Sequence, residues 1–344
     1  MNLGEYPLIF LGAGASAEFG IPVIRTMTKK FIQTHPRHQP RINKILCCLR
    51  RVGFPTNIEN ILSFARGQAN PKKALLDSSP FAACFVYDSS IPKLGYDRSA
   101  KTLVRDIEEF IAQKCLVQYD YEVDLIEKFY FRFFSHLENI FQVECPIGQE
   151  ESHIDIFTTN YDNIIEQYAI KKGIDFFDGY EQRADGTLKF SPDLYDSSGP
   201  IRLYNLHGSV TLGRVENKRT KDSAVIKSTM GIKVGDTYRV EWTIVDRAMI
   251  YGYEKDPSQE PYFDLLYILK HKLREAASVI VIGYSFSDKP ILNIFKNSID
   301  SHGNDFKMIV LNKNALRIKT SFFDNSHKVR SISQPFRNFR RIRG

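Results

Sequence analysis

The segment Phe10–Arg25, with the sequence FLGAGASAEFGIPVIR, restricts the fold of this chain more than any other. The apolar run Tyr6–Leu11 predicts a buried strand, and Gly12 and Gly14 end it and predict the start of a helix. Glycines let a backbone approach a ligand closely, so free N–H groups of the new helix are expected to face the gap, a geometry that binds phosphate. A plain tight turn between strand and helix would explain the same pattern.

The spacing Gly12-x-Gly14-x-x-Ala17 after a strand is typical of dinucleotide-binding folds. NAD-dependent dehydrogenases also need an Asp or Glu about 20 residues beyond the first glycine, where it holds the adenosine ribose. This chain has no carboxylate between Glu18 and Glu59. An ordinary dehydrogenase is therefore not expected.

Strand and helix patterns alternate along the rest of the chain. Further strands are predicted at 153–159, 202–206, 278–283 and 306–311, and helices at 101–141, 164–169, 263–276 and 291–299. This alternation predicts an α/β fold, a Rossmann-like doubly wound parallel sheet with helical and small β insertions. Ligands of such sheets bind at the carboxyl ends of the strands.

Polar residues and glycines stand at these predicted strand ends. They are Asn160, Asp162, His207, Gly283, Ser285 and Asn312. Taken singly, Asn160 could merely cap the following helix, and His207 could be a hydrogen-bonded core histidine. Their order along consecutive strand ends is the more specific observation.

A glycine loop, an Asn-x-Asp turn, a His-Gly pair, a Gly-x-Ser turn and a late Asn resemble, in this order, the sirtuin family. The opening GAGAS…GIP…R is similar to the nucleotide-binding start of that family, and the resemblance extends from about Tyr6 to Asn312. It implies a Rossmann-like sheet that binds NAD.

The resemblance also implies a role for each matched residue. The backbone around Gly12, Ala13, Gly14, Ser16 and Ala17 would hold the NAD pyrophosphate, while Gly283, Ser285 and Asn312 would contact the adenosine side. Asp162 would hold the nicotinamide carboxamide, Asn160 would position a water or a ribose hydroxyl, and His207 would act as general base. Cleavage of the ribose–nicotinamide bond develops positive charge on the sugar, and a fixed polar environment with a base near neutral pH suits that reaction.

One departure from the sirtuin pattern limits the activities that the resemblance implies. Protein-deacylating sirtuins carry a four-cysteine zinc module after the His-Gly turn, whereas the last of the five cysteines here is Cys145, so no zinc is expected. The helical stretch 101–141 lies where bacterial sirtuin-like NADases carry extra helices. The whole resembles the sirtuin-like effectors of antiphage defence, which implies an NAD glycohydrolase that uses NAD as substrate.

We expect one NAD-binding domain, 1–312, with a helical insertion at about 70–145 and a small β insertion at about 211–260. The remainder, 313–344, is a basic C-terminal extension, with eight Lys or Arg against one Asp from Arg317 onward. This local charge of +7 equals the net charge of the chain. Such a tail could contact nucleic acid or an acidic partner, or it could simply be solvated.

The partners are expected from the same resemblance. The 32 residues after Asn312 are too few for a sensor domain, so regulation should come from assembly or from a separate protein. A homo-oligomer and a HerA-type ATPase are the first expectation, and a short Argonaute is the alternative. No apolar run approaches the roughly 20 residues of a membrane span, so a cytoplasmic protein without membrane contact is expected.

Two other activities remain open at this point. One is an NAD-dependent protein deacylase or ADP-ribosyltransferase, and the other is a subunit that binds NAD or ADP-ribose without turnover. Two residues also keep open roles: Arg25 could pair with a phosphate or a loop carboxylate, and Glu59 stands three residues after Thr56, the spacing of a helix capping box.

Overall fold

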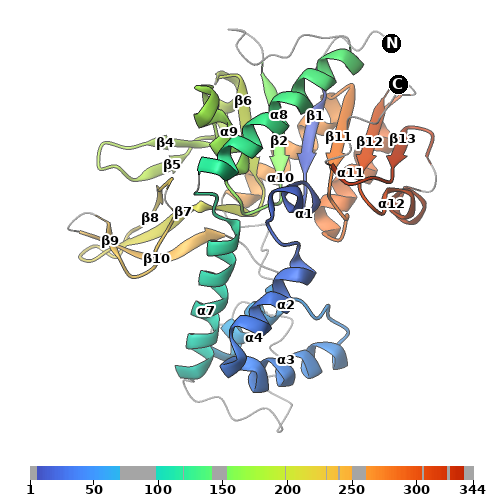
Figure 1. Ribbon diagram of the computed structural model, residues 1–344. Helices are drawn as coiled ribbons and strands as arrows, with labels where there is room; N and C mark the ends of the chain where they lie inside the picture. Colours follow the sequence, from blue (N-terminus) through green and yellow to red (C-terminus); the bar gives the residue numbers. More distant parts are fainter. Residues whose placement is uncertain are drawn as a thin grey trace. The chain divides into compact units, whose positions relative to one another are not determined.

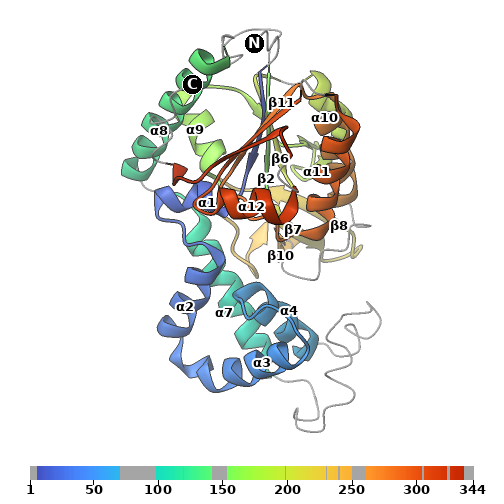
Figure 2. The ribbon, with the colours of Figure 1, turned by 90° about the vertical axis from the view of Figure 1, so that its right-hand side faces the viewer.

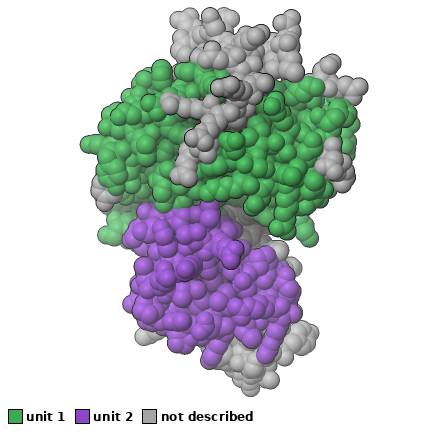
Figure 3. Space-filling view, turned by 45° about the vertical axis from the view of Figure 1, so that its right-hand side comes forward, with its two compact units in different colours: residues 1–21, 116–249, 257–344 green, residues 22–115, 250–256 purple. Residues whose placement is uncertain are grey.

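The computed structural model describes residues 6–69, 98–118, 120–141, 153–197, 199–229, 231–238, 241–249, 261–303, 306–323 and 326–336. The chain forms two compact units, coloured separately in Figure 3. Unit 1 comprises Met1–Ile21, Leu116–Met249 and Pro257–Gly344. Unit 2 comprises Pro22–Cys115 and Ile250–Asp256.

A seven-stranded sheet forms the centre of unit 1 (Figure 1). Its order is β13-β12-β11-β1-β2-β6-β3, and every neighbouring pair is parallel. The strands are β1 (Leu8–Leu11), β2 (Ile154–Thr158), β3 (Phe176–Phe177), β6 (Ile201–Asn205), β11 (Ser278–Ile282), β12 (Lys307–Leu311) and β13 (Val329–Ile332). Strand β1 lies between β11 and β2, so the chain's order reverses beside it, and this is where such sheets bind ligands.

Helices cover both faces of this sheet (Figure 2). On one face α10 (Tyr262–Glu275) and α11 (Lys289–Ser301) pack on the inward side chains of Phe10 and Val281. On the other face α8 (Asp120–Phe141) and α9 (Ile164–Lys172) pack on Ile9 and Leu11. Alternate residues of one strand thus serve two cores, which explains why the strands read as continuous apolar runs. The predicted doubly wound α/β fold is confirmed.

A second, antiparallel sheet in unit 1 has the order β4-β5-β8-β7-β10-β9. Its strands are β4 (Tyr180–Gln182), β5 (Leu188–Phe190), β7 (Gly208–Asn217), β8 (Ser223–Lys227), β9 (Thr237–Tyr238) and β10 (Trp242–Met249). The sheet therefore includes residues well before the expected start near 211. The hairpin β4–β5 is short and its strands are partly polar, so its sequence carries little strand signal.

The basic extension contributes structure to unit 1. Helix α12 (Ala315–Phe322) packs on the sheet, and β13 adds its outermost strand next to β12. Phe336 is 3% exposed, and its ring lies 4.6 Å from that of Phe129 on α8. The extension therefore takes part in the core as far as Phe336. Four of the eight basic residues from Arg317 onward lie in 337–344, outside the described residues.

Unit 2 is helical, with α2 (Ile24–Thr34), α3 (Gln39–Arg51), α4 (Ile58–Ala69) and α7 (Arg98–Cys115). Helix α3 begins at Gln39, and Pro40 occupies its first turn, where proline needs no amide partner. Asn57, not Thr56, caps α4, with its Oδ1 accepting from the amide of Asn60 at 2.9 Å. No helix within the described ranges is long and apolar enough to cross a membrane.

Candidate active site at the carboxyl ends of the parallel strands

Two backbone turns pack directly against each other where β1 and β11 end. Gly12 donates its amide to Ile282 O at 2.8 Å, and Gly14 donates to Gly283 O at 2.9 Å. A Cβ on Gly14 would lie 2.7 Å from the Cα of Gly283, so no larger residue fits. The glycines therefore serve close packing between two turns.

The predicted helix begins here but is short. Helix α1 (Ala13–Ser16) has four residues and continues into a 3-10 turn that starts at Ala17. The amides of Gly12, Gly14 and Ala15 all donate to backbone carbonyls, the last to Gly12 O at 2.8 Å. The prediction of free N–H donors is therefore wrong for these three. Ala13, at the first position of α1, is exposed.

Three predicted residues meet in one buried hydrogen-bonded network. Ser16 Oγ donates to Asp162 Oδ2 at 2.6 Å. Asn160 Nδ2 donates to Ser16 Oγ at 2.8 Å and to Gly12 O at 3.1 Å. The network joins the turn after β1 to the turn after β2, two adjacent strands of the sheet.

The network fixes how Asn160 presents its amide. A backbone carbonyl only accepts, so the contact with Gly12 O identifies the donor end of the side chain. Both amide hydrogens are then used, by Gly12 O and Ser16 Oγ. Within the described part of the chain Oδ1 has no hydrogen-bond partner. Asn160 therefore offers a ligand an acceptor and no donor.

Asp162 contributes a buried carboxyl to this network. Burial raises its pKa to about 6, although hydrogen bonds from Ser16 and from the amide of Ile164 act in the opposite direction. The Ile164 amide lies 3.3 Å from Oδ1, at the start of α9. Near neutral pH the carboxyl is mostly ionised, at an energetic cost that a cationic ligand would offset.

His207 follows β6 and faces a carboxylate from another strand end. Its Nε2 lies 3.4 Å from Oδ2 of Asp288, and both side chains are about nine-tenths buried. Asp288 also caps α11, with its side chain accepting from the amide of Ile291. A carboxylate beside one ring nitrogen sets the orientation of an imidazole. The sequence did not single out Asp288 as a site residue, although its place before Pro290 marks a helix cap.

The remaining predicted residues lie on the β11 and β12 side. Asn312 uses its side chain internally: Nδ2 donates to Tyr284 O at 3.0 Å, and Oδ1 accepts from the amide of Asn314 at 2.9 Å. It therefore holds the loop after β11 in place. Ser285 is exposed, and its hydroxyl lies 3.0 Å from that of Ser287.

A second buried carboxyl, Glu166, lies one helical turn beyond Asp162 and was missed by sequence reasoning. Burial raises its pKa to about 7, with Lys227 acting in the opposite direction. Ser209 Oγ donates to it at 3.4 Å, which ties α9 to the strand that follows His207. In the described ranges no group of three or more His, Cys, Asp or Glu side chains could hold a metal ion.

Several solved structures are similar to this chain in fold. A Sir2 homologue in complex with NAD is 13% identical, with 97% of this chain and 85% of that one covered and a TM-score of 0.45. A mutant Sir2 homologue in complex with ADP-ribose is 15% identical, with 97% and 88% covered and a TM-score of 0.42. A Sir2 protein bound to a propionylated peptide is 13% identical, with 99% and 93% covered and a TM-score of 0.41.

The family assignment rests on the sequence of the second half of the chain. No curated protein matches the chain. A family model described as the SIR2-like domain matches residues 155–331, just over half of the 344 residues. The match includes the ends of β2, β6, β11 and β12, and with them Asn160, Asp162, His207 and Asp288. This chain belongs to the SIR2-like domain family.

Proposed function

We propose that this protein is an NAD glycohydrolase, which cleaves NAD and water to ADP-ribose and nicotinamide. The observation that carries the proposal is the orientation of Asn160, whose Oδ1 accepts no hydrogen bond from any described residue while both hydrogens of Nδ2 are used. An acceptor of this kind can hold a water by one hydrogen and direct its lone pair toward an electrophilic carbon. Water is the second substrate of a hydrolase.

The other groups have matching roles in this proposal. Asp162 would accept from the nicotinamide carboxamide, and the cationic ring would offset its buried negative charge. The water oxygen would bond to the anomeric carbon as the bond to nicotinamide breaks, and that electron pair would leave with neutral nicotinamide. His207, oriented by Asp288, would take the released proton.

The setting that we propose is antiphage defence, with depletion of cellular NAD as the effect. Its support is the sequence resemblance and the absence of cysteine after Cys145, which leaves no four-cysteine zinc module in the SIR2-like region. We propose that activity is controlled by a homo-oligomer with a partner such as a HerA-type ATPase, in the cytoplasm. A short Argonaute is the alternative partner.

The direct test is NAD consumption by the purified chain, alone and with its neighbouring gene product and DNA. We expect ADP-ribose and nicotinamide in equal amounts, and a loss of at least about 100-fold in Asn160→Ala and His207→Ala, because each removes a group that acts on the reacting water or proton. Asn293→Ala and His271→Ala, which remove the same side-chain types from α11 and α10, should retain activity.

Two results would contradict the proposal in different ways. NAD bound tightly under all conditions, with no product, would make the chain a binding subunit. Release of nicotinamide only after addition of an acylated peptide or an acceptor protein would make it a deacylase or an ADP-ribosyltransferase.

Asp288→Asn provides a separate test of the His207 pair. Asparagine also caps helices well, so the cap of α11 and the melting temperature should be retained. The missing charge should leave His207 poorly oriented and lower kcat by about 10-fold or more with little change in KM. Steady-state kinetics at several NAD concentrations measure both constants. A rise confined to KM would show that Asp288 contributes equally to binding in the ground state and the transition state, and would contradict its role in orienting His207.

A further inference from the structure

The first part of unit 2 carries an unusual excess of positive charge. Residues 22–58 contain no Asp or Glu, and their eight Lys and Arg exceed the chain's net charge of +7. The eight are Arg25, Lys29, Lys30, Arg37, Arg41, Lys44, Arg50 and Arg51. The SIR2-like match begins at residue 155, so this charge lies outside the family's matched region.

Helices α2 and α3 turn this charge outward. Met27 and Phe31 form the buried stripe of α2, and Ile42, Ile45 and Leu49 form that of α3. The two helices follow one another around the edge of unit 2 (Figure 2), joined by the 3-10 turn Pro36–His38. Seven of the eight basic side chains are exposed and Arg41 is half-buried.

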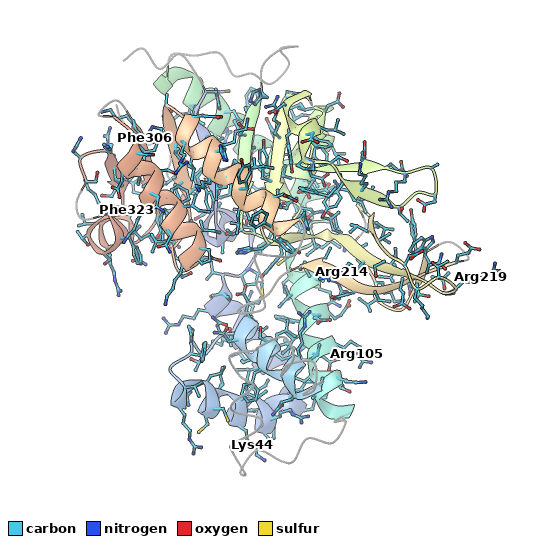
Figure 4. All side chains as sticks on the ribbon, turned by 180° about the vertical axis from the view of Figure 1, so that it is seen from behind. Lys44, Arg105, Arg214, Arg219, Phe306 and Phe323 are labelled. Carbon is cyan, nitrogen blue, oxygen red and sulfur yellow. The ribbon has the colours of Figure 1, made fainter. Side chains whose placement is uncertain are left out.

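Five of these cations have side chains without a hydrogen-bond or ion-pair partner among the described residues. They are the side chains of Arg25, Lys29, Lys30, Lys44 and Arg50. Two exposed arginines of unit 1, by contrast, form ion pairs. Arg214 lies 3.8 Å from Asp246, and Arg219 lies 3.7 Å from Glu241. Figure 4 labels both of these and Lys44. We name the α2–α3 surface with its five unpaired cations the basic face.

Like charges gathered without counter-charges favour a polyanion as partner. The composition of the basic face distinguishes between the polyanions. A membrane-bound helix inserts large apolar side chains, and neither α2 nor α3 exposes one. Proteins that bind single strands offer aromatic rings for base stacking, and the aromatic Phe31 is buried. Exposed Thr26, Gln33 and Asn43 are side chains of the kind that contact phosphates of a duplex.

We propose that the basic face binds the phosphate backbone of duplex DNA without regard to sequence. Each unpaired Lys or Arg would displace a condensed counterion from the duplex, and this release drives binding and makes it depend on salt. The proposal requires nothing of the NAD chemistry. It also differs from a nucleic-acid contact through residues 337–344 of the basic extension.

The test is fluorescence anisotropy of a labelled 30-base-pair duplex with the full chain, at a series of salt concentrations. The variant Lys29→Gln/Lys44→Gln/Arg50→Gln removes three unpaired cations from exposed positions. We expect the affinity to fall by at least about 10-fold at 100 mM salt, and the slope of log K against log salt to fall by about 2 to 3, since each phosphate contact contributes about 0.9.

The matched control is Lys189→Gln/Arg219→Gln/Lys233→Gln, which removes the same charge from side chains that pair with carboxylates in the second sheet and its connecting loops. It should bind the duplex like the wild type. An equal loss of affinity in this control would mean that net charge alone causes the effect, and would overturn the proposal. A chain truncated after Phe336 should also keep its binding. Loss in that truncation alone would assign binding to the tail, and binding to phosphatidylserine vesicles without binding to the duplex would make the surface a membrane contact.

Discussion

Gly283→Ala is expected to abolish the proposed NAD cleavage and to destabilise unit 1 by several kcal/mol. Gly283 has a φ of +66°, which costs an L residue about 1–2 kcal/mol. Its new Cβ would also lie 2.2 Å from the Ala15 nitrogen and 2.5 Å from the Gly14 Cα, atoms that belong to backbone and cannot rotate away. The turn after β1 would have to move, and with it Ser16, which holds Asn160 and Asp162 together.

Gly173→Ala separates the cost of the left-handed backbone from the cost of the steric clash between the two turns. Gly173 ends α9 with a φ of +64°, nearly the same as that of Gly283, but a Cβ there would meet nothing within 4 Å. Its cost should therefore be that of the left-handed backbone alone. Thermal unfolding of both variants, with NAD turnover measured in parallel, gives the comparison. Equal melting temperatures for the two would mean that the contact between the turns can relax.

The sequence predicts the central sheet well because its strands are buried on both faces. Residues 279–282 are continuously apolar, and the glycine that follows marks the strand end to within a residue. Asn160, Asp162 and His207 were predicted as site residues for the same reason, since each stands directly after such a strand. Their roles remain predictions. What the structure adds is that Ser16, Asn160 and Asp162 share one network.

The features that the sequence did not predict depend on contacts between distant segments. Asp288 looks like a simple helix cap, and only the folded sheet brings it to His207. The amides of Gly12 and Gly14 look free because their acceptors, Ile282 and Gly283, are some 270 residues away along the chain. Phe336 sits in a basic tail, where nothing local indicates that its ring packs on α8.

The buried carboxyl of Asp162 in the candidate site is expected to make the stability of the fold depend on pH. Its pKa is about 6 in the folded chain against 3.8 for an ordinary aspartate, so between pH 4 and pH 6 the folded state holds a proton that the unfolded chain has released. Stability contributed by this group therefore falls as the pH rises through that window, by about 3 kcal/mol for two pKa units. Above about pH 6 the loss is complete.

Asp162→Asn should consequently give a more stable protein with little activity. At pH 8 we expect it to exceed the wild type by about 1–3 kcal/mol in free energy of unfolding, with the difference vanishing near pH 4, where both side chains are neutral. The proposed NAD cleavage should fall by about 100-fold or more, because the neutral amide would no longer attract the cationic nicotinamide ring of the proposed substrate. Urea unfolding across pH 4–8 and NAD turnover at pH 7.5 measure the two effects.

Asp155→Asn is the control, because we expect it to change the free energy of unfolding in the opposite direction. Asp155 on β2 is also buried, which raises its pKa, but His153 and Lys272 outweigh burial and the net pKa is lowered. Lys272 Nζ lies 3.4 Å from its Oδ2. Removing this charge should destabilise the protein at neutral pH. If Asp162→Asn also destabilises at pH 8, then Ser16 and the Ile164 amide stabilise the ionised carboxylate fully, and a cationic ligand is not needed to offset its charge.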